Sequence, residues 1–82
     1  MKAKEMFEAL GCECVENSDF YLIYIWIFKE NGVQYEIEFS LEDKEVAITP
    51  TYNDEQIYFV LLEMKLLKAI NQQCKELGWL DE

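Results

Sequence analysis

The hydrophobic positions of this 82-residue chain change their period twice, and these changes predict the order of its elements. A short helix near the start has one apolar stripe at helical spacing, made of Ala3, Met6, Phe7 and Leu10. Gly11 follows it and is suited to the left-handed position that ends a helix. A second, longer helix is predicted over residues 63–77. Gly78 should then let Trp79 fold back on the last turn near Cys74.

Between the helices the hydrophobic period becomes two, which is the period of strands with one buried face. The clearest strand is predicted over residues 33–41, where the apolar residues alternate with Gln34, Glu36, Glu38 and Ser40. A weaker strand followed by a turn is predicted in residues 12–19, and another strand in residues 45–52. Pro50 places this last strand at a sheet edge or ends it. Residues 56–62 are rich in strand-forming side chains, so they predict either a short strand or an early start of the second helix.

Residues 20–28 are all apolar or aromatic, so both faces of this strand are hydrophobic. Asn31-Gly32 after it is a strong signal for a two-residue hairpin turn, because such a turn needs positive φ at both positions. With that loop, four pairs face each other in the core: Phe28 and Tyr35, Trp26 and Ile37, Tyr24 and Phe39, Leu22 and Leu41. A two-residue loop at Asp43-Lys44 predicts two pairs in the next hairpin: Leu41 and Val46, Phe39 and Ile48.

The same register leaves Ile23, Ile25 and Ile27 on the other face of the strand. A loop one residue longer would reverse the two faces, because the side-chain period of a strand is two. In both registers one face of the strand keeps a hydrophobic stripe that must be covered from solvent by another part of the protein or by a partner. One helix on each face would supply it in a three-layer structure, and a second copy or a partner protein would supply it otherwise.

Together these elements predict an α+β fold in one domain, residues 1–82. It consists of a short N-terminal helix, an antiparallel meander of three or four strands, and a long C-terminal helix packed on the sheet. A core of this size stabilises a domain by only about 3–5 kcal/mol. Additional burial against a partner would therefore have a large effect on stability.

Charge restricts the kinds of partner. Seventeen acidic residues and seven lysines give a net charge of −10, and the chain has no Arg and no His. Direct binding to nucleic acid or to an anionic membrane is therefore not expected, because both need a cationic surface. Nine of the acidic residues and one lysine lie from Glu30 to Glu63, which gives this section a net charge of −8.

The acidic residues of the hairpin over residues 33–52 form the candidate partner-binding surface. They are Glu36, Glu38, Glu42, Asp43 and Glu45. Carboxylates spaced along a strand face and its turn can imitate a row of phosphates toward a protein that grips nucleic acid, so a basic protein is the expected partner. The alternative is a solvated edge whose like charges discourage pairing with other sheets.

No catalytic residue, metal site or cofactor is predicted. Cys12 and Cys14 should project from the same face of a strand, but a structural zinc site needs four Cys or His ligands. The odd number of cysteines, with Cys74 as the third, fits buried, reduced thiols in the cytoplasm, and no apolar run is long enough to cross a membrane. Glu36 and Glu38 have the separation of paired glycosidase carboxylates but no orienting group, so we expect a protein that is not an enzyme.

The two ends of the chain resemble a family of small hypothetical proteins of phages and prophages of Gram-positive bacteria. The resemblance rests on "AKEMFEALG" near the start and "LLKAINQQCKELGWL" near the end, and it covers about 25 residues. The chain differs from the family in having Cys12 after the first Leu-Gly and Glu63 at the expected helix cap. The resemblance implies a phage or prophage context and no assigned activity, so no functional residue is transferred.

The expected function is that of a non-enzymatic protein-interaction module. Small acidic phage proteins often block host proteins, so this module is expected to inhibit a host nucleic-acid-binding protein in the manner of an anti-CRISPR inhibitor. The alternative is a structural module that forms a homodimer or larger oligomer through Ile23, Ile25 and Ile27.

Overall fold

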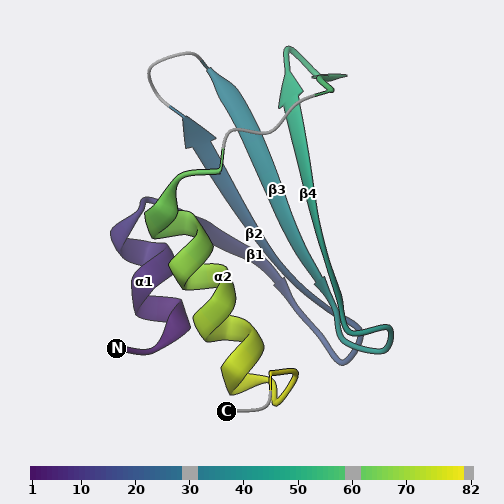
Figure 1. Cartoon of the computed structure of the whole chain (residues 1–82). Helices are drawn as coiled ribbons and strands as arrows, with labels where there is room; N and C mark the ends of the chain where they lie inside the picture. The colour runs from purple at the N-terminus through teal and green to yellow at the C-terminus, as the bar shows by residue number, and fades with distance from the viewer. Residues whose placement is uncertain (29–31, 59–61, 81–82) are drawn as a thin grey trace.

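The computed structural model describes residues 1–28, 32–58 and 62–80 as an α+β fold (Figure 1). The helices are α1 (Ala3–Ala9) and α2 (Met64–Glu76). The strands are β1 (Glu13–Asn17), β2 (Tyr21–Phe28), β3 (Val33–Ser40), β4 (Glu45–Tyr52) and β5 (Glu55–Gln56). All neighbouring strands are antiparallel and follow the order of the chain, which makes the sheet a meander.

The sheet has five strands where three or four were predicted, and α2 has thirteen residues where a long helix was expected. The additional strand β5 is only two residues long and pairs with Thr51 and Tyr52 at the end of β4. The open question at residues 56–62 is answered in part, because Gln56 ends β5 and residues 59–61 lie outside the described residues. Pro50 lies opposite Tyr35 and does not end its strand.

The predicted faces of β2 are correct, and the predicted register is wrong by two residues. Trp26 pairs with Tyr35, and Tyr24 pairs with Ile37. The pairing ends at Phe28 and Val33, so the connection between the strands has four residues instead of the predicted two. Asn31, on which the prediction relied, lies outside the described residues. A shift of two positions leaves every side chain on its predicted face, because the period of a strand is two.

The hairpin between β3 and β4 shows the same shift. Phe39 pairs with Val46, because a four-residue turn over residues 41–44 replaces the predicted two-residue loop. The N–H of Lys44 donates to the carbonyl of Ser40 at 2.8 Å, and Lys44 takes a positive φ of 57° to close the turn. This longer turn again keeps the predicted side chains on the inner face.

Both helices pack on the same face of the sheet, so the alternative with one helix on each face is wrong (Figure 1). The ring of Phe7 on α1 stacks on Tyr24 with centroids 4.0 Å apart, and Trp79 after α2 lies 6.2 Å from Phe39. The buried core combines residues of both helices with residues of β2 and β3: Ala3, Phe7, Cys12, Leu22, Tyr24, Trp26, Tyr35, Ile37, Phe39, Leu66, Ala69, Ile70 and Cys74. We call this covered side the inner face and the opposite side the outer face.

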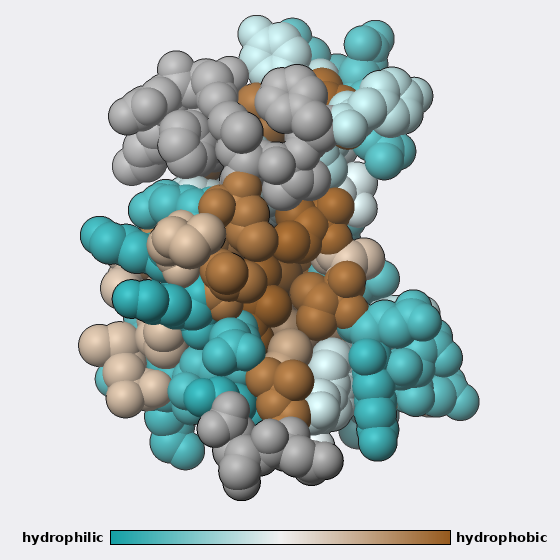
Figure 2. Space-filling model, viewed as in Figure 1, coloured by the Kyte–Doolittle hydropathy of each residue, from teal (hydrophilic) through white to brown (hydrophobic). Residues whose placement is uncertain are grey.

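Most described inner-face residues of β2 and β3 are buried, and cover is thinner over β4. Val46 and Ile48 are only partly buried, although both pack against the core. Figure 2, seen from the side of the helices, shows an apolar band between α2 and β4. The two helices therefore cover β2 and β3, which have the most apolar side chains, more fully than they cover β4.

The ends of both helices explain why Leu-Gly occurs twice in the chain. Gly11 and Gly78 have φ of 90° and 77°, and each is the left-handed residue of a Schellman motif. After α1 the N–H of Cys12 donates to the carbonyl of Phe7 at 3.0 Å, and after α2 the N–H of Trp79 donates to the carbonyl of Cys74 at 2.9 Å. The predicted return of Trp79 toward Cys74 is confirmed.

One carboxylate links the two helices. The carboxylate of Glu76 at the end of α2 accepts a hydrogen bond of 2.7 Å from the N–H of Ala3. This N–H lies in the first turn of α1, where backbone N–H groups have no acceptor within their own helix. This bond lowers the pKa of Glu76, burial opposes the shift, and Gln72 and the charge of Lys2 add to it. The helices are therefore held antiparallel by a charge-assisted contact between their ends.

We predict that Glu76→Gln makes unfolding easier by about 1 kcal/mol at neutral pH, a low value because the carboxylate is exposed. Folding lowers the pKa of Glu76, so its contribution is present above the pKa of a free Glu, about 4.3, and is lost as the pH falls through the folded-state value. Urea unfolding of both proteins between about pH 7 and pH 3 measures this, and their stabilities should converge at low pH.

Glu8→Gln is the matched control, because Glu8 is an exposed carboxylate on α1. It should not show a stability difference that disappears at low pH. A difference for Glu76→Gln that stays constant across the pH range would contradict the assignment.

Candidate functional site

The outer face of the sheet brings together the two surfaces that the sequence predicts separately. Cross-strand neighbours share a face, so the registers of the ladders show which residues lie side by side. They align two rows across β1, β2 and β3: Glu13–Ile25–Glu36 and Glu16–Ile23–Glu38. In each row an isoleucine lies between two glutamates. We call these the two glutamate–isoleucine rows.

Glu13 and Glu16 were not predicted as site residues, and a β-bulge explains why. In a regular strand, residues two apart share a face, so Glu13 and Glu16 would point to opposite sides. The register of β1 shifts between Cys14 and Glu16, and Val15 has no partner on β2. This bulge places both glutamates on the outer face. The signal in the sequence that could have indicated the bulge is the three-residue spacing of Glu13 and Glu16 within a short strand.

The isoleucines of the outer face differ in exposure. Ile23 is 8% exposed but does not belong to the core cluster beneath the helices, Ile25 is half-buried, and Ile27 is 55% exposed. The stripe becomes more open toward Ile27, whose neighbour on β3 is Gln34.

The other predicted acidic residues lie at one end of the sheet. Glu42 and Asp43 belong to the turn between β3 and β4, and the hydroxyl of Ser40 donates to the carboxylate of Asp43 at 3.2 Å. Glu45 pairs with Ser40 at the start of β4. The structure therefore places Glu36 and Glu38 beside the isoleucines. Glu42, Asp43 and Glu45 lie apart from them, at the end of the hairpin between β3 and β4.

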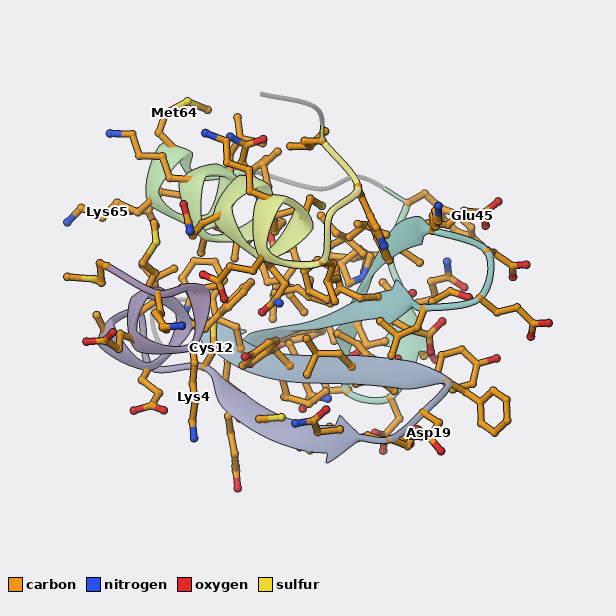
Figure 3. All side chains as sticks on the ribbon, turned by 90° about the horizontal axis from the view of Figure 1, so that it is seen from below. Lys4, Cys12, Asp19, Glu45, Met64 and Lys65 are labelled. Carbon is orange, nitrogen blue, oxygen red and sulfur yellow. The ribbon has the colours of Figure 1, made fainter. Side chains whose placement is uncertain are left out.

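Charge is divided between the two layers. Residues 13–28 and 32–58 carry ten acidic residues and one lysine, a net charge of −9. Residues 1–12 and 62–80 carry five lysines and four glutamates, a net charge of +1. Figure 3 shows Lys4 and Lys65 at the helical end, with Asp19 and Glu45 at the far end of the sheet.

Within the paired strands β1 to β4, the outer-face positions include no lysine. These positions are Glu13, Glu16, Tyr21, Ile23, Ile25, Ile27, Gln34, Glu36, Glu38, Ser40, Glu45, Ala47, Thr49 and Thr51. The carboxylates at these described positions therefore have no lysine among their neighbours on the paired strands. Such a surface attracts a cation from outside the molecule.

The three cysteines have different environments. Cys12 lies in the core just before β1, and Cys14 pairs with Tyr24 of the inner face, so both cysteines lie on the inner side as predicted, although Cys12 is not part of the strand. Burial raises the pKa of the Cys12 thiol to about 11 and also raises the pKa of Cys74. Cys14 is exposed, and its thiol donates a weak hydrogen bond to the carbonyl of Glu16 at 3.5 Å. Buried thiols are thus found at two of the three positions.

Features of a catalytic site are not apparent in the described part of the chain. No three Cys, Asp or Glu side chains there are grouped so as to hold a metal ion. A hollow of about 310 Å³ lies between the helices, and its lining contains no carboxylate or thiol: Met1, Met6, Ala9, Leu10, Lys65 and Lys68. Neither described helix is long and apolar enough to span a membrane.

Comparison of the chain with protein-family models, curated protein sequences and solved structures finds no significant match.

We predict that one thiol reacts promptly with a disulfide reagent at about pH 8 and that two react only when the fold opens. Cys14 should be the fast one, because the thiolate is the reactive species and burial disfavours it at Cys12 and Cys74. Cys14→Ser should remove the fast phase. Two fast thiols in the folded wild-type protein would contradict the placement of the cysteines.

Proposed function

We propose that this chain is a non-enzymatic protein-interaction module that binds a basic protein through the outer face of its sheet. The observation that supports it is the pair of glutamate–isoleucine rows, which combine an apolar contact area with uncompensated carboxylates. Apolar burial supplies affinity, and complementary charge supplies orientation and a fast association rate. The acids at Glu42, Asp43 and Glu45 extend the attraction beyond the contact area.

The class of partner follows from the layout of the carboxylates. Ile23 and Ile25 are two residues apart, about 7 Å, so the glutamates opposite them form a pair of negative charges at about this spacing on each side of β2. A protein that grips nucleic acid has a cationic groove for a comparable row of phosphates. We therefore propose that the partner is a nucleic-acid-binding protein of the host and that the module inhibits it, in an anti-CRISPR-like manner and in a phage or prophage context within the cytoplasm.

Self-association is the second candidate, because on the outer face Ile25 is only half-buried and Ile27 is 55% exposed. Two copies packed through this face would, however, bring the four glutamates of one copy against the four of the other. Like charges placed together at an interface cost several kcal/mol. This repulsion favours a basic partner over a second copy.

We predict that Glu36→Lys with Glu38→Lys weakens capture of the partner from host lysate by roughly tenfold, which corresponds to about 1.4 kcal/mol. Capture should also decrease as salt increases, because these charges are exposed to solvent. The measurement is affinity capture with quantitative mass spectrometry, followed by a nucleic-acid-binding assay of the captured protein. The module should reduce that binding, and the double variant should not.

The matched control is Glu8→Lys with Glu63→Lys, which changes the net charge equally on the helical layer. It should retain capture to within about twofold, since long-range charge alone has a small effect at physiological salt. Equal loss in both double variants would contradict a role for the outer face. A stable dimer in sedimentation experiments that Ile27→Glu dissociates would instead support self-association.

A further inference from the structure

The width between the acidic flanks of the outer face limits what can lie between them. β1 and β3 are the two neighbours of β2, so their glutamates are two strand spacings apart, about 10 Å. An α-helix with its side chains is about 10–12 Å wide. A helix lying along β2 would therefore contact the isoleucines and bring its two flanks directly over the glutamates of β1 and β3.

The length of the apolar stripe also fits a helix. It runs from Tyr21, which is 41% exposed, through the three isoleucines to Ile27, a rise of about 20 Å along β2. At 1.5 Å per residue this equals about 13 helical residues. The inner face of the same sheet already carries a helix of that length, because α2 has thirteen residues.

Other occupants fit the outer face less well. An extended peptide binds a sheet by adding a strand to its edge and would leave this face uncovered. A second copy of the chain would oppose glutamates to glutamates across both rows. The face therefore favours an element that contributes side chains of two kinds from one narrow surface, and an amphipathic helix does this.

We infer that the outer face binds a basic amphipathic α-helix of the partner protein, which lies along β2 and completes a three-layer α/β/α arrangement. The helix would present apolar residues at i, i+3 or i+4, and i+7 to Ile25 and Ile27, with Lys or Arg on both sides of that stripe. One side reaches Glu13 and Glu16, and the other reaches Glu36 and Glu38. This inference rests on the proposed function and defines which part of the basic partner is recognised.

The test uses the full chain and two synthetic peptides of about 18 residues made of Leu, Lys and Ala. In the first, Leu forms one helical stripe flanked by Lys, and in the second the same residues are scrambled so that no stripe exists. The first peptide should bind at least tenfold more tightly in calorimetry and become helical on binding by circular dichroism. Amide shifts should concentrate at β1, β2 and β3.

Two variants complete the test. Ile27→Glu is suited to it because Ile27 is 55% exposed, so the fold should tolerate the change, and it should weaken binding of the striped peptide at least fivefold. Glu13→Lys with Glu36→Lys should weaken it further, and Glu8→Lys with Glu63→Lys should leave it within about twofold.

The outcomes separate this inference from the proposed function. Equal binding of both peptides, or shifts confined to the turn at Glu42 and Asp43, would overturn the helix inference while basic-protein capture through Glu36 and Glu38 still stands. Loss of outer-face dependence in that capture would overturn the proposed function itself. A dimer that Ile27→Glu dissociates would show a second copy as the occupant and would overturn both.

Discussion

The stacking of Phe7 on Tyr24 establishes which side of the sheet becomes the core. It attaches the short helix α1 to the aromatic face of β2, and α2 then covers the rest of that face beside α1. A helix of seven residues has little stability by itself, so its position depends on this contact and on the bond between Ala3 and Glu76. Because both helices pack on one side, neither of them covers the isoleucine side of β2.

The same arrangement separates apolar burial from charge. The helices carry most of the lysines, while the acidic residues lie on the strands and their turns, away from the helical layer. A single bulged residue, Val15, decides whether β1 contributes to the outer surface. Without the bulge one of the two glutamates of β1 would point toward the inner side of the sheet and would be lost from the outer face. The symmetry of the two glutamate–isoleucine rows about β2 therefore depends on one local irregularity.

Sequence reasoning predicted the parts that depend on periodicity. The faces of β2 and β3, the presence of a C-terminal helix and the Schellman motif at Gly78 follow from spacing and from a residue that tolerates positive φ, and the structure confirms them. The registers of both hairpins were wrong because turn length is set by local backbone hydrogen bonds, such as that from Lys44 to Ser40. A register shift of two residues leaves the period unchanged, so the hydrophobic pattern has no power to detect it. Glu13 and Glu16 were missed because a bulge breaks the period of two, and the placement of both helices on one face was open because either face of β2 is apolar enough to accept them.

The division of charge between the layers makes the molecule an electric dipole as well as an anion. The sheet is the strongly negative end, the described residues of the helical layer are close to neutral, and the shortest dimension of the molecule is 20 Å. In the field of a cationic body such a dipole experiences a torque that turns the sheet toward it before contact. Fewer collisions would then fail through wrong orientation, because rotation during approach replaces part of the random search. With the proposed basic partner, the lysines on the helical side would therefore act at a distance, because they would help to turn that side of the molecule away.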